Sequence, residues 1–290
     1  MIPASFDYIA PQTLDEAVRA LAEHGEEAKL LAGGHSLLPL MKLRLANPKL
    51  LIDLRRIPSL SGIRQQDDKI IVGALTTHYQ MDSSELLKRK CPLLPQTARE
   101  IGDVQVRNRG TIGGSLTHAD PSADWPAAIL ALGGELKLSG PKADRTVQAE
   151  MFFLGPMTTG IESTEILTEI RVPVFGSRCR SAYLKMAQQA SGFAIVGVAV
   201  WLKIGQQARC EDIGVGVTGL SDKPFRARLV EERLRGKKLT PELIEESASQ
   251  VATGIDPTAD LHASAEFRAH LARVYASRAI QEAAKQVRGR

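Results

Sequence analysis

The 290-residue sequence predicts an α+β fold, and three observations support this prediction. Residues 6–54 read as strand, helix, strand, loop and strand, an order that favours a small parallel or mixed sheet. Residues 135–172 contain strands in succession with few helices, which favours an antiparallel sheet for the second segment. After residue 177, three more strands are followed by helical sequence. The length predicts about two domains, at roughly 150 residues each.

The first segment is expected to hold a capped helix between strands. Thr13 and Glu16 have the spacing of a capping box, and apolar residues then recur at helical spacing until His24 and Gly25, where the helix is expected to end. The predicted strands of this segment are Phe6–Ile9, Lys29–Ala32 and Leu50–Leu54.

The second segment combines strands with short helices. Thr76 and Thr77 are expected to open a helix toward Met81, and Asp124 is expected to cap the helix that follows it. The other predicted helices are Leu93–Ile101 and Pro126–Leu132, each with a proline in its first turn. The predicted strands are Lys69–Ala74, Glu135–Leu138, Met151–Phe153 and Glu165–Val172.

The third segment begins after Pro173–Ser177, which reads as a linker. Its middle strand is apolar on both faces and is therefore expected to be buried on both sides. The predicted strands are Ser181–Ala187, Ala194–Ile204 and Ile213–Thr218, and the predicted helices are Arg226–Leu234, Pro241–Thr253 and Ser264–Gln286.

Two glycine pairs, each followed by a hydroxyl residue, carry most of the functional information. The first lies in Ala32-Gly33-Gly34-His35-Ser36 and the second in Thr111-Ile112-Gly113-Gly114-Ser115. Glycine permits a positive φ and leaves no Cβ between its amide and a ligand, and consecutive amides in such a turn form a concave anion site. Two such loops predict a clamp around a dianion such as a pyrophosphate.

A third glycine pattern, Gly214-Val215-Gly216-Val217-Thr218-Gly219, matches G-x-G-x-x-G. A dinucleotide site would need a helix that starts within this motif, whereas Leu220–Pro224 reads as a turn. Residues 213, 215 and 217 alternate as in a strand, so we interpret the pattern as a glycine-rich strand.

Other chemistries have weaker support in the sequence. His35, His118, Asp120 and Asp124 lack the tight spacing of metal ligands, and His35, Ser36 and Asp124 come without the G-x-S-x-G elbow of a hydrolase. The three cysteines are far apart and form no C-x-x-C, which argues against a zinc site, an iron–sulfur site or a disulfide framework.

Composition and charge indicate an ordinary soluble protein, with 43% hydrophobic and 24% charged residues. Aromatic residues make up only 4%, too few for a base-stacking surface, and the net charge of +4 comes from dispersed Lys and Arg without a long basic run. The longest uncharged apolar segment, residues 193–202, is about half the length of a membrane helix. We therefore expect a cytoplasmic protein that neither spans a membrane nor binds nucleic acid.

The two glycine loops, in this order and near these positions, resemble those of the FAD-binding medium subunits of molybdenum hydroxylases, the xanthine dehydrogenase family in its three-subunit form. The resemblance covers nearly the whole chain and is strongest to the flavoprotein subunits of aerobic carbon monoxide dehydrogenases. The segments that carry it are Met1-Ile2-Pro3, Phe6-Asp7-Tyr8, Ala32-Gly33-Gly34-His35-Ser36-Leu37-Leu38-Pro39, Gln105-Val106-Arg107-Asn108-Arg109-Gly110-Thr111-Ile112-Gly113-Gly114, Glu165-Ile166-Leu167-Thr168-Glu169-Ile170 and Tyr183-Leu184-Lys185.

The resemblance implies a two-lobed FAD-binding domain of the PCMH type at residues 1–176, with lobes at about 1–56 and 57–176. A C-terminal domain of the carbon monoxide dehydrogenase flavoprotein type would follow at 177–290, made of a three-stranded antiparallel sheet and a helical bundle. FAD would lie between the lobes, and the loops Ala32–Ser36 and Thr111–Ser115 would hold its pyrophosphate from two sides.

The resemblance also implies roles for single residues. Leu31 and Leu37 would flank the first loop, Ile101 would lie against the isoalloxazine, Asp124 and Lys185 would contact FAD, and Leu167 would line the flavin. Ser115 stands where some relatives carry Asn, and its hydroxyl keeps a hydrogen-bond donor at that position. No catalytic acid–base pair and no metal ligand is expected in this chain.

By the same resemblance, the protein would pass electrons and leave substrate oxidation to its partners. A large subunit would hold the molybdenum cofactor and a small subunit would hold two [2Fe–2S] clusters, in a dimer of heterotrimers. One alternative is a stand-alone flavin oxidase of the same fold with FAD attached at His35. Another is a non-enzymatic nucleotide-binding or nucleic-acid-binding protein, suggested by the basic pI of about 9.0.

Overall fold

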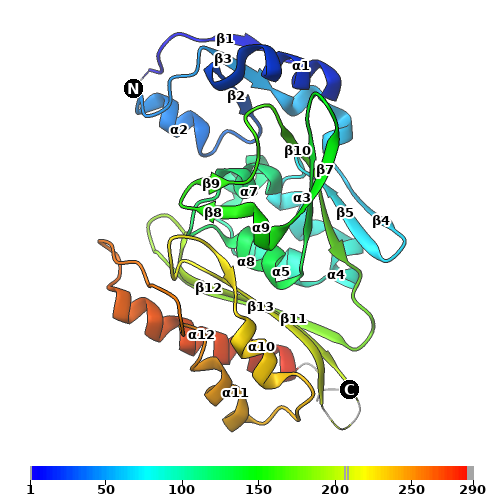
Figure 1. Ribbon diagram of the computed structural model, residues 1–290, viewed down its shortest axis with the longest axis vertical. Coiled ribbons are helices and arrows are strands. Elements are labelled where there is room, and N and C mark those ends of the chain that lie inside the picture. Colours follow the sequence, from blue (N-terminus) through cyan, green and yellow to red (C-terminus); the bar gives the residue numbers. More distant parts are fainter. Residues whose placement is uncertain (1, 206, 208, 286–290) are drawn as a thin grey trace.

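The computed structural model describes residues 2–205, 207 and 209–285. Three main sheets follow one another along the long axis of the molecule, with helices packed between and beside them (Figure 1). In chain order they are the first sheet (β1, β3, β2), the second sheet (β4, β5, β10, β6, β7) and the third sheet (β11, β12, β13, β14). A two-stranded ribbon of β8 and β9 completes the strands.

The first sheet is parallel, because β1 and β2 both pair with β3 in the same direction, and this agrees with the predicted parallel or mixed sheet. The capping box is also confirmed: the Glu16 amide donates to Thr13 Oγ1 over 3.2 Å, and the Glu16 carboxylate accepts from the Thr13 amide. Ala17, Val18 and Leu21 bury one face of the capped helix. The elements are β1 (Asp7–Ile9), α1 (Leu14–His24), β2 (Ala28–Leu31), α2 (Leu37–Lys42) and β3 (Leu50–Asp53); α2 was not predicted.

The second sheet is antiparallel throughout, which confirms the second prediction. The strand predicted at Met151–Phe153 is wrong, because Met151 lies in a short helix and the strand begins at Phe153. The elements are β4 (Ile63–Gln66), β5 (Lys69–Gly73), α3 (His78–Ser83), α4 (Glu85–Lys90), α5 (Leu93–Arg99), α6 (Val104–Arg109), α7 (Ile112–His118), α8 (Asp124–Ala131), β6 (Glu135–Ser139), β7 (Asp144–Gln148), α9 (Ala149–Phe152), β8 (Phe153–Gly155), β9 (Thr158–Thr159) and β10 (Ile166–Pro173).

The third sheet holds the three predicted strands and a fourth of two residues, β14, where a helix was expected to begin. Helix α12 packs on one face of the sheet and α8 on the other (Figure 1), so β12 is buried on both sides as predicted. The elements are β11 (Cys179–Ala187), β12 (Ala194–Ile204), β13 (Cys210–Thr218), β14 (Phe225–Arg226), α10 (Arg228–Leu234), α11 (Pro241–Ala248) and α12 (Ala265–Lys285); the predicted helix end at Gln286 lies outside the described residues.

The G-x-G-x-x-G pattern belongs to strand β13 and the turn after it, so the strand interpretation is confirmed. A Cβ atom at Gly214 or Gly216 would lie 2.0 Å from the carbonyl oxygen of Ala131 or Ala127. The two glycines therefore let the backbone of α8 rest directly on β13. This close packing fixes the position of α8, whose first residue is Asp124.

Within the described part of the chain, no helix is long and apolar enough to cross a membrane.

Candidate cofactor-binding site

The first glycine pair forms a turn between β2 and α2. Gly34 has a φ of +82°, which a side chain would strain, and His35 beside it is exposed. Leu31 and Leu37, on either side of the turn, pack with Met41 and Leu51 in a small apolar cluster that anchors it. Among the described residues, none accepts a hydrogen bond from the backbone amides of residues 33–36. These donors can therefore bind an anion.

The second glycine pair is not a loop, and this part of the prediction is wrong. Gly113 and Gly114 lie in the first turn of α7, neither has a positive φ, and Thr111 is the N-cap. The four amides of residues 112–115 are already bound, to Thr76 O, Ala74 O, Thr111 Oγ1 and Thr111 O respectively. Gly113 serves close packing instead, since a Cβ there would lie 2.5 Å from the Ala74 Cβ.

The two glycine segments nevertheless lie against each other. A Cβ at Gly33 would lie 2.3 Å from the Arg109 carbonyl oxygen and 2.8 Å from the Gly110 Cα. A Cβ at Gly114 would lie 3.6 Å from the Ala32 Cβ. The turn after β2 thus meets the end of α6 backbone to backbone, and it also approaches the first turn of α7.

A cavity of about 220 Å³ opens beside this contact. Its charged lining residues are both arginines, Arg55 and Arg109. Arg55 is held by the buried Asp53, whose pKa is lowered to about 2 by Arg55 and Tyr8 in spite of the opposing effect of burial. The remaining lining residues are Ala32, Ile57, Pro58, Ser61, Leu75, Thr77, Gln80, Asn108 and Thr111. Ala32, which directly precedes the amides of residues 33–36, lines the cavity, and amide donors beside a cavity with two arginine side chains fit a dianionic group.

The buried side chain of His78 packs against Gly110, at the contact between the two glycine segments. His78 Nδ1 accepts a hydrogen bond from Trp125 Nε1 over 3.0 Å, and the His78 amide donates to Gly110 O over 3.0 Å. Burial, and secondly the charges of His35 and Arg107, lower the pKa of His78 to about 3. A Cβ at Gly110 would lie 2.6 Å from His78 Nε2. The neutral imidazole of His78 thus packs against the Gly110 backbone. The sequence analysis did not identify His78 as a site residue.

A second group of candidate residues surrounds the start of α8. Asp124 does not cap this helix: Ala123 occupies the N-cap, and the Asp124 carboxylate accepts from Tyr183 and Lys185 on β11. Lys185 Nζ lies 3.0 Å from Asp124 Oδ1, and both side chains are almost fully buried. The Asp124 carboxylate therefore binds the oppositely charged Lys185 ammonium and not the amides in the first turn of α8.

Burial raises the pKa of Asp124 to about 6, although Lys185 and Tyr183 both lower it. The Tyr183 pKa lies well above its usual value for the same reason, burial, and because of the nearby carboxylate. Tyr183 lies in a motif that carries the family resemblance, but the sequence alone assigns it no role. The two-residue period of a strand was the available signal, because it places Tyr183 on the same side as Lys185.

The two remaining candidates differ in position. Ile101 is half-buried in the turn after α5, next to Glu100, whose carbonyl oxygen accepts from Lys185. Leu167 is buried in β10 as part of the main core, opposite Leu138. The candidates therefore form two clusters, one at the glycine contact and one around Asp124, and Leu167 packs in the core.

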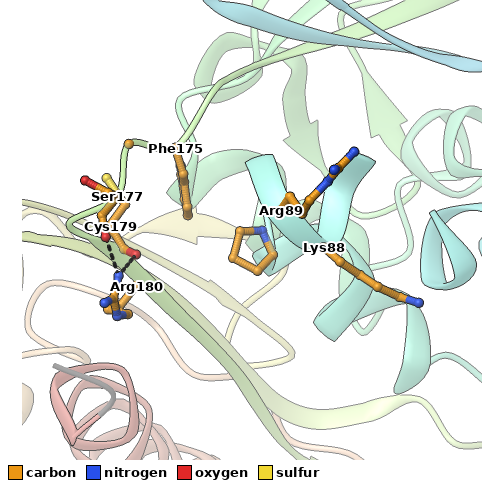
Figure 2. Close-up of a pocket in the computed structure, with 8 residues that line it drawn as sticks. Lys88, Arg89, Phe175, Ser177, Cys179 and Arg180 are labelled. Carbon is orange, nitrogen blue, oxygen red and sulfur yellow. Dashed lines mark hydrogen bonds between the residues drawn. The ribbon is translucent and has the colours of Figure 1, made fainter. Parts of the chain in front are cut away.

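A larger cavity, of about 440 Å³, lies elsewhere, between α4 and the segment that joins β10 to β11. Figure 2 shows that its cationic side chains diverge: Lys88 and Arg89 point away from Phe175, and Arg180 folds back on its own turn. The Arg180 guanidinium donates to the carbonyl oxygens of Ser177 and Cys179 over 2.7 and 2.8 Å. None of the predicted site residues lines this cavity.

Comparison with known proteins identifies the family. Residues 4–175 match the FAD binding domain in molybdopterin dehydrogenase. The chain belongs to this family. Residues 181–283 match the CO dehydrogenase flavoprotein C-terminal domain, so both parts of the chain agree with the resemblance stated from its motifs.

Relatives of this FAD-binding family match along the whole chain. The chain is 40% identical over 283 residues to the carbon monoxide dehydrogenase medium chain of Hydrogenophaga pseudoflava, with 98% of each covered. It is 37% identical to the glyceraldehyde dehydrogenase medium chain of Sulfolobus acidocaldarius, with 98% of this chain and 100% of that one covered. The solved carbon monoxide dehydrogenase of H. pseudoflava that lacks the Mo-pyranopterin moiety superposes with a TM-score of 0.95, at 40% identity and 98% coverage of each chain.

Proposed function

We propose that this chain is the FAD-carrying electron-transfer subunit of a molybdenum hydroxylase. It would take electrons from the [2Fe–2S] clusters of a small partner and pass them to an external acceptor. A large partner would hold the molybdenum cofactor and oxidise the substrate, and the complex would be a dimer of heterotrimers. The observation that carries the proposal is the backbone contact at Gly33, with unpaired amides and two arginines beside it.

The chain's own residues would bind and orient the cofactor, which when bound supplies a two-electron carrier. The amides of residues 33–36 would donate to the diphosphate, with Thr111 to Ser115 packed alongside. Because the amides of residues 112–115 already have acceptors, α7 would contribute shape and its Thr111 cap. Leu31 and Leu37 would anchor the turn, and Ile101, Leu167, Asp124 and Lys185 would face or support the flavin.

We propose the domain boundary at residues 176 and 177. The family matches stop at residue 175 and resume at 181, and β10 ends at Pro173 before β11 begins at Cys179. Lobes at about 1–56 and 57–176 would then correspond to the first and second sheets. The cytoplasmic location stays a prediction.

The substrate would be chosen by the large partner. Two relatives match this chain over almost the same length and at similar sequence identity. One is named for carbon monoxide and the other for glyceraldehyde. This pattern supports a flavin subunit that serves different oxidation reactions.

The alternative of a stand-alone oxidase depends on covalent flavin at His35, which is exposed beside the glycine turn. We expect acid precipitation of the purified protein to release its yellow colour into the supernatant, because the contacts proposed above for the cofactor are non-covalent. Colour that stays in the pellet, and that a His35→Ala variant loses, would favour the oxidase. Purification from the source organism should also yield two partner chains, one with molybdenum and one with iron and labile sulfide.

A further inference from the structure

Tyr183 occupies a buried position that the proposed cofactor contacts do not explain. Its side chain is 5% exposed and its hydroxyl donates to Asp124 Oδ1. The neighbouring strand leaves room for this hydroxyl at Gly197, where a Cβ would lie 2.5 Å from it. The fold thus positions the Tyr183 hydroxyl to donate a hydrogen bond to the Asp124 carboxylate.

Lys185 uses all three of its ammonium hydrogens. They are donated to Asp124, to the Glu100 carbonyl oxygen over 2.7 Å and to the Gly192 carbonyl oxygen over 2.6 Å. Glu100 precedes Ile101, and Gly192 lies in the hairpin turn between β11 and β12. Lys185 therefore ties the turn at residues 100–102 to the hairpin at residues 188–193.

This tie depends on a negative charge at Asp124. The groups that act on this carboxyl are Tyr183 and Lys185 on β11 and Glu100 at the end of α5, and Glu100 opposes ionisation. A protonated Asp124 would leave the buried ammonium without its counter-charge. The Tyr183 hydroxyl adds a hydrogen bond that favours the ionised form.

We propose that Tyr183 is a positioning residue: it holds Asp124 ionised and oriented toward Lys185, so that Lys185 can lock the 100–102 turn to the 188–193 hairpin beside the flavin. The first part concerns this chain alone. The location beside the flavin rests on the proposed function.

The test uses the full-length chain with Tyr183→Phe, which keeps the ring and removes the hydroxyl. The matched control is Tyr79→Phe, at an exposed tyrosine of α3. The first measurement is amide hydrogen exchange without FAD, at Gln188, Gly192 and Phe193, whose amides are hydrogen-bonded within the hairpin. We expect faster exchange in Tyr183→Phe and unchanged exchange in the control; equal rates in Tyr183→Phe and the wild type would overturn the proposal.

The second measurement is the dissociation constant of FAD across pH 5 to 9. In the wild type, affinity should fall as the pH drops through about 6, where Asp124 becomes protonated. Loss of the hydroxyl should move this midpoint upward by about one pH unit, since a hydrogen bond to a charged group is worth roughly that much. An unmoved midpoint would contradict the assignment of Tyr183.

Two further results distinguish a failure of this proposal from a failure of the proposed function. Asp124→Asn should abolish the midpoint near pH 6, and it provides a test even if Tyr183→Phe folds poorly; persistence of that midpoint would refute the role of Asp124. If the chain binds no FAD, the proposed function fails, but the exchange measurement still decides whether Tyr183 holds the lock.

Discussion

Replacing Gly33 with valine is expected to weaken the binding of FAD strongly. The new Cβ would lie 2.3 Å from the Arg109 carbonyl oxygen, well inside any normal contact. The opposing backbone cannot move aside alone, because the Gly110 amide is bound to Val106 O and its carbonyl oxygen accepts from the His78 amide. The turn after β2 must therefore separate from the end of α6 at the point where we place the diphosphate.

Overpacking of this kind typically costs about 1–3 kcal/mol, and a loss of that size in binding energy corresponds to roughly a 5- to 150-fold weaker affinity. The loss of the aligned amides adds to this. Titration of apoprotein with FAD, followed by flavin fluorescence, measures the change. Gly155→Val is the matched control, because no atom lies within 4 Å of a Cβ at that position. Wild-type affinity in Gly33→Val would show that the contact plays no part in binding.

Lys185→Met should destabilise the folded protein strongly, and more so at high pH. The change removes the cation from a carboxylate that is only 5% exposed. Breaking a buried pair by removing one partner typically costs about 3–5 kcal/mol. Urea unfolding at pH 8 should show a loss of this size.

The sign of the pH dependence follows from Asp124. Its pKa is raised to about 6 in the folded protein, so the stability from this group is fully present below its unfolded pKa and is lost as the pH rises through the folded one. Without Lys185 the folded pKa rises further, and the penalty should be small at pH 5 and grow above pH 6. Lys49→Met, at an exposed ion pair with Glu27, should change stability by less than about 1 kcal/mol at either pH. A pH-independent effect of Lys185→Met would contradict this explanation.

The elements that could be predicted from the sequence are those fixed by local patterns. The capping box at Thr13 and the Thr77 cap of α3 each form within four residues, and both occur as predicted. The burial of the middle strand of the third segment could be predicted because both of its faces are apolar. The resemblance to a flavoprotein family was specific because its motifs occur together, whereas a single glycine pair would not have identified the family.

The parts that could not be predicted depend on tertiary contacts. The sequence predicts a loop at the second glycine pair, but close packing of Gly113 on Ala74 and the Thr111 cap make it the start of a helix. Asp124 is of a residue type that often caps helices, but Lys185, sixty-one positions later, binds its carboxylate instead. The partners of Tyr183 and His78 likewise come from distant segments. Single-sequence patterns carry no information about such pairings.

Amide hydrogen exchange with and without FAD tests the central claim most directly. The amides of residues 33–36 have no acceptor among the described residues and should gain strong protection when FAD binds, whereas those of residues 112–115 are already hydrogen-bonded and should change little. Unchanged exchange at residues 33–36 in the FAD-loaded protein would contradict the assignment of the diphosphate to the Gly33–Gly34 turn.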